Sequence, residues 1–198
     1  MHPTPVGRPI STATAIATAV LMVGLSPSLG DAQAVNLTFT ADSAVYAPSA
    51  EWYQQQWNSD GPRILRAMEA ASGLRFGNLE IRVIVYLGPS YTGAGDSLPM
   101  HLNVRYPFGM TLVHELGHRL NGQIRDRPAE VDEHRLLYLW LYDAWVALYG
   151  RHFADAAVAA EKGWASQGFV FIASDWDWAL AMTPEQRARR LGELRSRD

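Results

Sequence analysis

The feature that most constrains this chain is a pair of histidines four residues apart, His114 and His118, with Glu115 between them. On an α-helix, residues four apart lie on one face about one turn apart, so both imidazoles can bind a single metal ion while Glu115 stands beside it. The apolar residues around the pair recur at the helical period, and they are Leu112, Val113, Leu116 and Leu120. The sequence therefore predicts a helix that carries a metal site.

Gly117 lies in the middle of this predicted helix, where glycine lowers helix stability relative to most other residues. A reason to keep glycine at such a position is the close approach of another part of the chain. We therefore expect another backbone segment to pack tightly against the helix at Gly117.

The stretch His114-Glu115-Leu116-Gly117-His118 resembles the signature of the zincin metallopeptidases, which lies on their active-site helix. The resemblance covers only the motif and its immediate neighbours, so it implies the chemistry of a site more strongly than a whole fold. It implies that His114 and His118 bind Zn²⁺ and that Glu115 acts as the general base towards a water molecule.

Two histidines do not complete a catalytic zinc site, which usually has three protein ligands and an open fourth position. The metzincin pattern would require a third histidine at position 124, and Ile124 excludes that subgroup. Further along, Glu130 and His134 lie four apart and share a helix face. We favour His134 as the third ligand, oriented by Glu130; the alternative is Glu130 itself, as a gluzincin-like site would imply. Asp132 and Glu133 are the remaining candidates.

The first 34 residues have the pattern of a secretory signal peptide. Arg8 precedes a mostly apolar run at 10–25, and Ala32-Gln33-Ala34 supplies a cleavage site. The run is short for a bilayer span, so we expect export to the periplasm or the medium and no stable membrane insertion after cleavage. A disordered leader or an uncleaved anchor are the alternatives. Residues 35–198 are then one domain, and without cysteine it has no disulfides.

The composition is that of a globular protein: 48% of the residues are hydrophobic, with 7 Trp, 8 Tyr and 6 Phe. The formal net charge is −3, so the chain lacks the basic character of a nucleic-acid-binding protein. We therefore expect no nucleic-acid partner.

The strand and helix patterns of 35–198 predict an α+β fold, in which a small, largely antiparallel sheet built around 80–87 and 100–105 is packed with helices. The β-branched run at 80–87 should be the central strand. By the zincin resemblance, the strand at 100–105 should be the sheet edge that binds an extended substrate. A long buried helix at 129–150 should follow the motif helix. The other predicted elements are a strand at 35–40 and helices at 49–57, 62–72, 151–164 and from 184.

Several other side chains have a predicted place. Asp143, an acid within an apolar stretch, should pair with an arginine. Tyr138 should pack in the core, although it lies one turn beyond His134 and is an alternative donor to the cleft. His101 should be a solvated strand residue, with a place facing the cleft as the alternative. The aromatic residues of the first helix should also pack inward, and they are Trp52, Tyr53 and Trp57.

These features together predict an exported zinc-dependent metallopeptidase that hydrolyses a peptide or protein substrate, with Glu115 as general base. Two other functions agree with the same motif. One is a catalytically inactive zinc-binding envelope or interaction protein. The other is a metallohydrolase of a non-protein amide, such as a cell-wall crosslink. The sequence leaves the substrate and the oligomeric state open.

Overall fold

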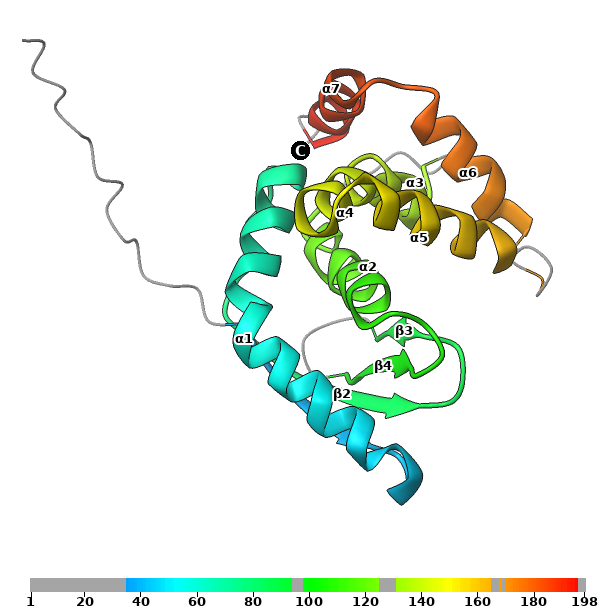
Figure 1. Cartoon of the computed structure of the whole chain (residues 1–198). Helices are drawn as coiled ribbons and strands as arrows, with labels where there is room; N and C mark the ends of the chain where they lie inside the picture. The colour runs from blue at the N-terminus through cyan, green and yellow to red at the C-terminus, as the bar shows by residue number, and fades with distance from the viewer. Residues whose placement is uncertain (1–34, 94–97, 125–130, 165–167, 169, 196–198) are drawn as a thin grey trace, which may run out of the picture. The chain divides into compact units, whose positions relative to one another are not determined.

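A computed structural model describes residues 35–93, 98–124, 131–164, 168 and 170–195 of the chain (Figure 1). The predicted signal peptide at 1–34 and the alternative ligand Glu130 lie outside these residues. Both therefore stay predictions.

The described strands form one mixed sheet in the order β1-β2-β4-β3. β1 (Val35–Ala41) and β4 (Met100–Asn103) flank β2 (Leu79–Tyr86), and both pair with it in parallel. Only the two-residue β3 (Tyr91–Thr92) runs antiparallel, and it pairs with β4. The predicted α+β class and the central place of β2 are confirmed. The largely antiparallel sheet is wrong, because the long connections β1–β2 and β2–β4 each return the chain to the same end of the sheet.

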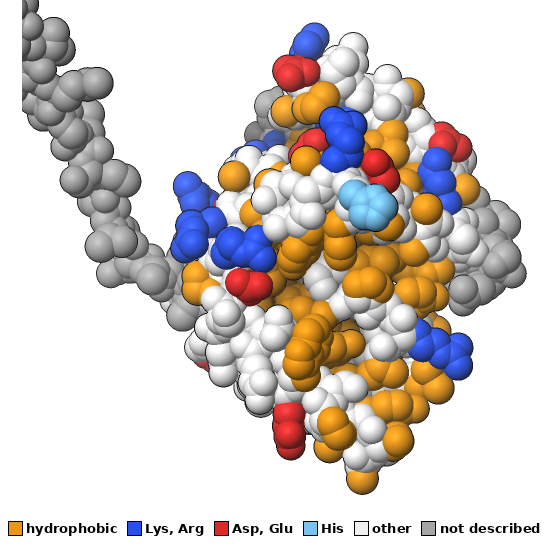
Figure 2. Space-filling view, viewed as in Figure 1, with side chains coloured by type: hydrophobic (Ala, Val, Ile, Leu, Met, Phe, Trp, Pro, Cys, Tyr) orange, Lys and Arg blue, Asp and Glu red, His pale blue; other side chains and the backbone are white. Residues whose placement is uncertain are grey.

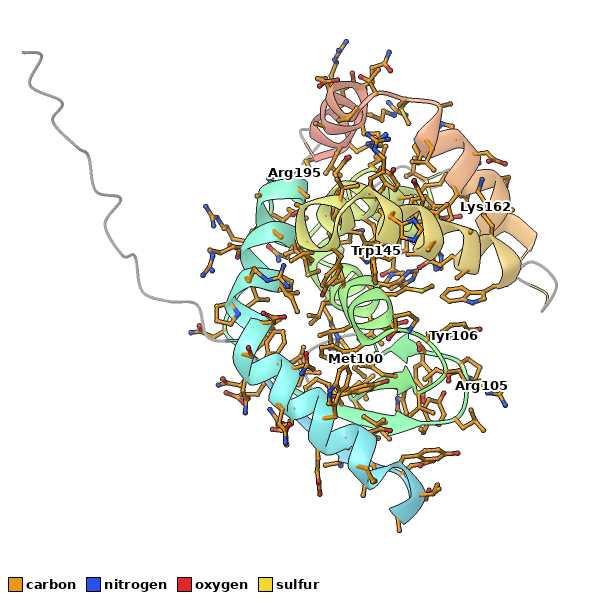
Figure 3. The ribbon with its side chains drawn as sticks, viewed as in Figure 1. Met100, Arg105, Tyr106, Trp145, Lys162 and Arg195 are labelled. Atoms are coloured by element: carbon orange, nitrogen blue, oxygen red, sulfur yellow. The ribbon has the colours of Figure 1, made fainter. Side chains whose placement is uncertain are left out.

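One face of the sheet is buried and the other faces solvent, as the alternating strands indicate. The buried side chains of β1 and β2 come from alternate positions, and they are Val35, Leu37, Phe39, Ile81, Val83 and Val85. The helices α1 and α2 contact the sheet (Figure 1). In Figure 3 Met100 marks the sheet side of the core and Trp145 the helical side, and both side chains are fully buried.

The first helix, α1 (Ala47–Ser72), is continuous where the sequence predicts two helices at 49–57 and 62–72. Pro62 lies inside α1, and its exposed position leaves the carbonyl group that loses a hydrogen-bond donor within reach of water. The buried stripe continues through this point from Tyr53 and Trp57 to Ile64 and Met68. Tertiary burial therefore holds together a helix that the proline signal divides.

Part of the aromatic prediction is wrong as well. Tyr53 and Trp57 are buried in the core, but Trp52 is 48% exposed, and Val45 just before α1 is 73% exposed. On the face drawn in Figure 2, hydrophobic side chains gather in the middle while most Lys and Arg side chains lie toward the margins. Spacing alone did not distinguish the inward aromatic residues of α1 from the outward one.

Helices α2 to α7 make up the rest of the described fold. Their bounds are α2 Phe108–Asn121, α3 Glu133–Tyr138, α4 Leu141–Tyr149, α5 Arg151–Gly163, α6 Val170–Leu180 and α7 Pro184–Arg195. The predicted long helix at 129–150 is wrong, because the chain breaks between α3 and α4 at Trp140, whose φ of −140° is not helical. The Trp140 indole is drawn into the core, where it donates to the Asn121 side chain at 3.1 Å. The described helices include none with the length and hydropathy to span a bilayer.

Candidate metal centre

The helix α2 carries the predicted motif, with His114 and Glu115 buried and His118 partly buried. A methyl group added at Gly117 would overlap Leu137 and approach the ring of Trp140. A close approach at Gly117 is thus present, but side chains make it, so the prediction of a backbone contact is wrong. The absence of a side chain at Gly117 lets α3 lie directly against α2.

α3, whose Leu137 side chain makes this contact, also supplies the third histidine. Asp132 caps the helix, because its side chain accepts a hydrogen bond from the Arg135 backbone N–H at 2.9 Å. His134 follows in the first turn. The cap fixes where α3 starts, and the packing at Gly117 fixes how close it comes to α2.

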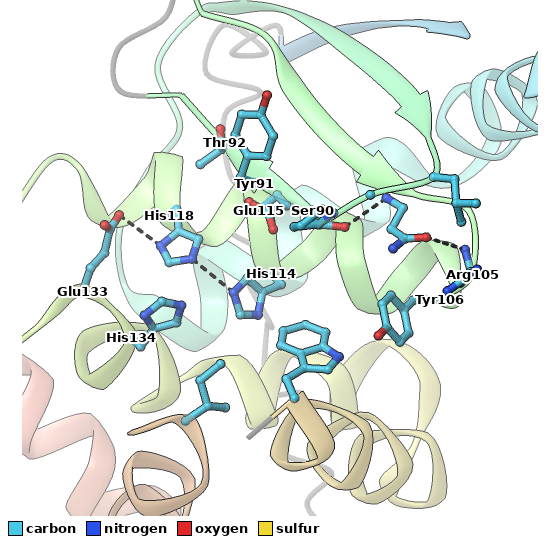
Figure 4. Close-up of a pocket in the computed structure, with 16 residues that line it drawn as sticks. Ser90, Tyr91, Thr92, Arg105, Tyr106, His114, Glu115, His118, Glu133 and His134 are labelled. Carbon is cyan, nitrogen blue, oxygen red and sulfur yellow. Dashed lines mark hydrogen bonds and ion pairs between the residues drawn. The ribbon is translucent and has the colours of Figure 1, made fainter. Parts of the chain in front are cut away.

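His114, His118 and His134 form a group that could hold a metal ion (Figure 4). One ligating nitrogen from each lies within 4.8 Å of the others. Nε2 of His114 and Nε2 of His118 are 3.1 Å apart, close to the separation of about 3.3 Å that two nitrogens have on a tetrahedral zinc ion with bonds of about 2.0–2.1 Å. The favoured choice of His134 as the third member of the group therefore agrees with the structure.

Two carboxylates hold the other nitrogens of the motif histidines. Glu161 Oε1 lies 2.7 Å from Nδ1 of His114, and Glu133 Oε1 lies 3.0 Å from Nδ1 of His118. A carboxylate on one ring nitrogen fixes the ring and directs the other nitrogen toward a metal. Glu133, one of the remaining ligand candidates in the sequence, thus lies against the outer nitrogen of His118 and outside the three-histidine group.

Sequence reasoning missed Glu161, which lies on α5, 47 residues after His114. Its side chain is fully buried, and its second oxygen accepts a hydrogen bond from the Trp176 indole at 2.8 Å. One signal was present in the sequence. Glu161 falls on the buried stripe of α5 at helical spacing from Ala154, Ala157 and Val158, where an acid requires a partner.

The surroundings of the three histidines shift their pKa values in different directions. Burial, followed by the charges of His114 and His118, lowers the pKa of His134 to about 3. Burial also lowers the pKa of His118, whereas at His114 the nearby Glu161 outweighs burial and raises the pKa. Neutral imidazole is the form that can bind a metal, and burial favours that form at His118 and His134.

Glu115 stands beside the group and outside it. The residue is only 4% exposed, and burial is the main reason that its pKa is raised to about 7. Its Oε2 atom has no hydrogen-bond partner among the described residues. A buried carboxylate oxygen without a partner is uncommon in a folded protein, and this one lies in the wall of a cleft.

The cleft has a volume of about 470 Å³, which falls in the range of small-molecule and peptide sites. The three histidines, Glu115 and Glu133 line one part of it. The rest of the wall comes from the segment 87–92, from the loop between β4 and α2 and from two helices near the C-terminus, and its residues are Leu87, Gly88, Pro89, Ser90, Tyr91, Thr92, Asn103, Arg105, Tyr106, Trp164 and Ile172.

The predicted substrate edge at 100–105 is wrong, because β3 pairs with the outer side of β4 and is itself the edge. His101 is partly buried, and the Tyr91 ring stacks on it at 4.2 Å between centroids. Tyr138 packs in the core as predicted, stacked on Trp176 at 3.9 Å between centroids. Burial, with a contribution from Glu161, raises the pKa of Tyr138 far above its ordinary value.

Comparison with known proteins finds no relative of this chain: no family model, no curated protein and no solved structure matches it. The function must therefore be argued from the site itself.

Proposed function

We propose that this protein is a zinc-dependent metallopeptidase that acts outside the cytoplasm. The observation that carries the proposal is the meeting of three imidazoles from α2 and α3 beside the buried Glu115 in the wall of one cleft. Export rests on the signal-peptide pattern of residues 1–34.

The donor set favours zinc. Three imidazole nitrogens without thiolates are typical of catalytic zinc sites, which keep a fourth position open for water or substrate. When bound, zinc supplies a water molecule of lowered pKa and polarises a carbonyl group. His114, His118 and His134 would hold it, with Glu161 and Glu133 orienting the first two rings.

Glu115 would perform the proton transfers. It takes a proton from the attacking water and returns it to the leaving amine, which requires a carboxylate near the water and not bound to the metal. The Oε2 atom of Glu115, buried and without a partner among the described residues, is suited to this task because no hydrogen bond has to be broken first. The low exposure of Glu115 keeps bulk water away from the transferred proton.

The two edges of the sheet differ in a way that suits a peptide substrate. At β1 the side chain of Gln54 occupies the edge, accepting from Phe39 N–H and donating to the Leu37 carbonyl, each at 3.1 Å. The other edge, β3, borders the cleft through Tyr91 and Thr92. An extended peptide can add to such an edge through backbone hydrogen bonds. Among the described residues, no side chain binds the backbone of β3, the edge next to the histidines, in this way.

Glu115→Gln tests the proposal. The substitution keeps the shape of the side chain but removes the base, so zinc content should stay near that of the wild type. Cleavage of a peptide library by the chain beginning at Val35, followed by mass spectrometry, should fall by about 10² to 10⁴. Glu51→Gln, an exposed position on α1, is the matched control and should cleave like the wild type.

If the zinc-loaded wild-type chain cuts no peptide and Glu115→Gln behaves in the same way, the peptidase proposal is wrong. A zinc-binding interaction protein would then be the better description.

A further inference from the structure

We propose that Ser90, Asn103 and Arg105 form a carboxylate-binding subsite in the cleft, on the side away from His134. This subsite would make the enzyme select peptides that carry a carboxylate near the bond to be cut. The inference rests on the proposed peptidase function and deepens it by naming the substrate class.

A chain of hydrogen bonds links the three residues. The Asn103 backbone N–H donates to Ser90 Oγ at 3.0 Å, and the Arg105 backbone N–H donates to Asn103 Oδ1 at 2.9 Å. Asn103 is 8% exposed and lines the cleft. With Oδ1 occupied, the Nδ2 group of this buried amide makes no hydrogen bond to another described residue, so it is a donor that the cleft can offer to a ligand.

The positive and negative side chains of the cleft lie on different sides of it. Arg105 is the one Lys or Arg among the described lining residues, and its guanidinium makes no ion pair or hydrogen bond with the described part of the chain. The carboxylates of the cleft, Glu115 and Glu133, lie with the histidines instead. Figure 4 shows Glu133, His118 and His134 on one side of the cleft and Arg105 with Tyr106 on the other.

These donors match one kind of ligand. A guanidinium binds a carboxylate through paired, charge-assisted hydrogen bonds, and an amide N–H₂ and a hydroxyl can add neutral ones. Arg105 is exposed, at the loop that enters α2 (Figure 3), so it can reach a ligand at the cleft mouth while keeping part of its hydration. Peptides offer a carboxylate from two sources, the C-terminus and an Asp or Glu side chain.

The test measures binding separately from turnover. Zinc-loaded Glu115→Gln chain would be titrated with matched short peptides that differ in one group: a free C-terminus against a C-terminal amide, and Asp against Asn. We expect the preferred acid form to bind about 10-fold more tightly than its neutral match, the lower end for a hydrogen bond to a charged group. The pair that shows the difference identifies the source of the carboxylate.

Adding Arg105→Gln should abolish this preference, and Arg105→Lys should keep only part of it because the paired geometry is lost. Arg189→Gln, an exposed arginine on α7 outside the cleft, is the matched control and should leave the preference intact. Equal binding of acid and neutral peptides, binding of neither, or a preference that survives Arg105→Gln would overturn the subsite.

Turnover of the same peptides by the wild-type chain separates the two proposals. Cleavage without any preference for acid peptides overturns the subsite and leaves the peptidase standing. An Arg105-dependent binding preference without any cleavage supports the subsite and overturns the peptidase.

Discussion

Two polar clusters pack against the apolar core of this protein, and they differ in whether they are complete. In the first, Arg187 donates to both oxygens of Asp143, at 2.6 and 3.1 Å, and to the Met182 carbonyl at 2.7 Å. In the second, the Nε2 atoms of His114 and His118 face each other at 3.1 Å, and Glu115 has an oxygen without a partner among the described residues.

The difference separates a structural cluster from a functional one. Asp143 pairs with an arginine, as the sequence predicted, and the pair needs no further group; the Asp143 side chain is 30% exposed, and Arg187 is the buried partner. In the histidine cluster, Glu161 and Glu133 lie against the outward nitrogens of His114 and His118, while the inward Nε2 atoms of these two rings lie within hydrogen-bond distance of each other and close to His134. Such an arrangement costs free energy, and a ligand that completes the cluster offsets this cost.

The largest expected effect is on metal content. Changing both His114 and His118 to Ala should remove the bound zinc, because one imidazole alone holds zinc poorly. Elemental analysis of the purified chain measures it. Asp143→Asn is the control from the complete cluster: it should lower the free energy of unfolding by about 1–3 kcal/mol, since Arg187 loses its charged partner, and leave zinc unchanged. Full zinc in the double histidine variant would place the metal elsewhere.

The next effect concerns the third ligand. His134→Ala should lower zinc affinity more than Glu130→Ala, because the structure includes His134 in the ligand group. Competition with a chromophoric chelator gives both affinities under identical conditions. A larger loss for Glu130→Ala would move the third ligand to that residue and make the site gluzincin-like.

A smaller effect on zinc affinity is expected for Glu161, which contacts the outer nitrogen of His114. Glu161→Gln should weaken zinc binding by about 10- to 100-fold, the usual result of removing a partner that orients a metal-bound histidine. Trp176→Phe removes only the indole donor to Glu161 and should weaken binding less. If Trp176→Phe weakens zinc binding as much as Glu161→Gln, general disruption of the packing around α6 would explain both results, and the orienting role of Glu161 would be lost.

The sequence predicted the local part of the site well. The spacing of His114, Glu115 and His118 is a property of one helix. The short connection that turns the chain back towards this helix was enough to favour His134. Glu161 could not be found in the same way, because the tertiary fold brings α5 to His114 from 47 residues away. Periodicity within one segment does not report such tertiary partners.

The fold shows the same limit. The β-branched run of β2 predicted a central strand, but alternation does not reveal which way neighbouring strands run, so the parallel pairing was missed. β3 has two residues and no readable pattern, so the sequence offers no edge strand other than the one that the zincin resemblance implies at 100–105. Composition alone predicts one continuous helix over 129–150. The contact at Gly117 and the burial of Trp140 in the core break it between α3 and α4.

The most direct measurement of the central claim is X-ray absorption at the zinc edge of the metal-loaded chain. We predict three imidazole nitrogens at about 2.0–2.1 Å and one further light-atom ligand. The His134→Ala variant should show one imidazole fewer. A zinc site with two imidazoles or fewer in the wild-type chain, or a spectrum that His134→Ala leaves unchanged, would contradict the three-histidine centre.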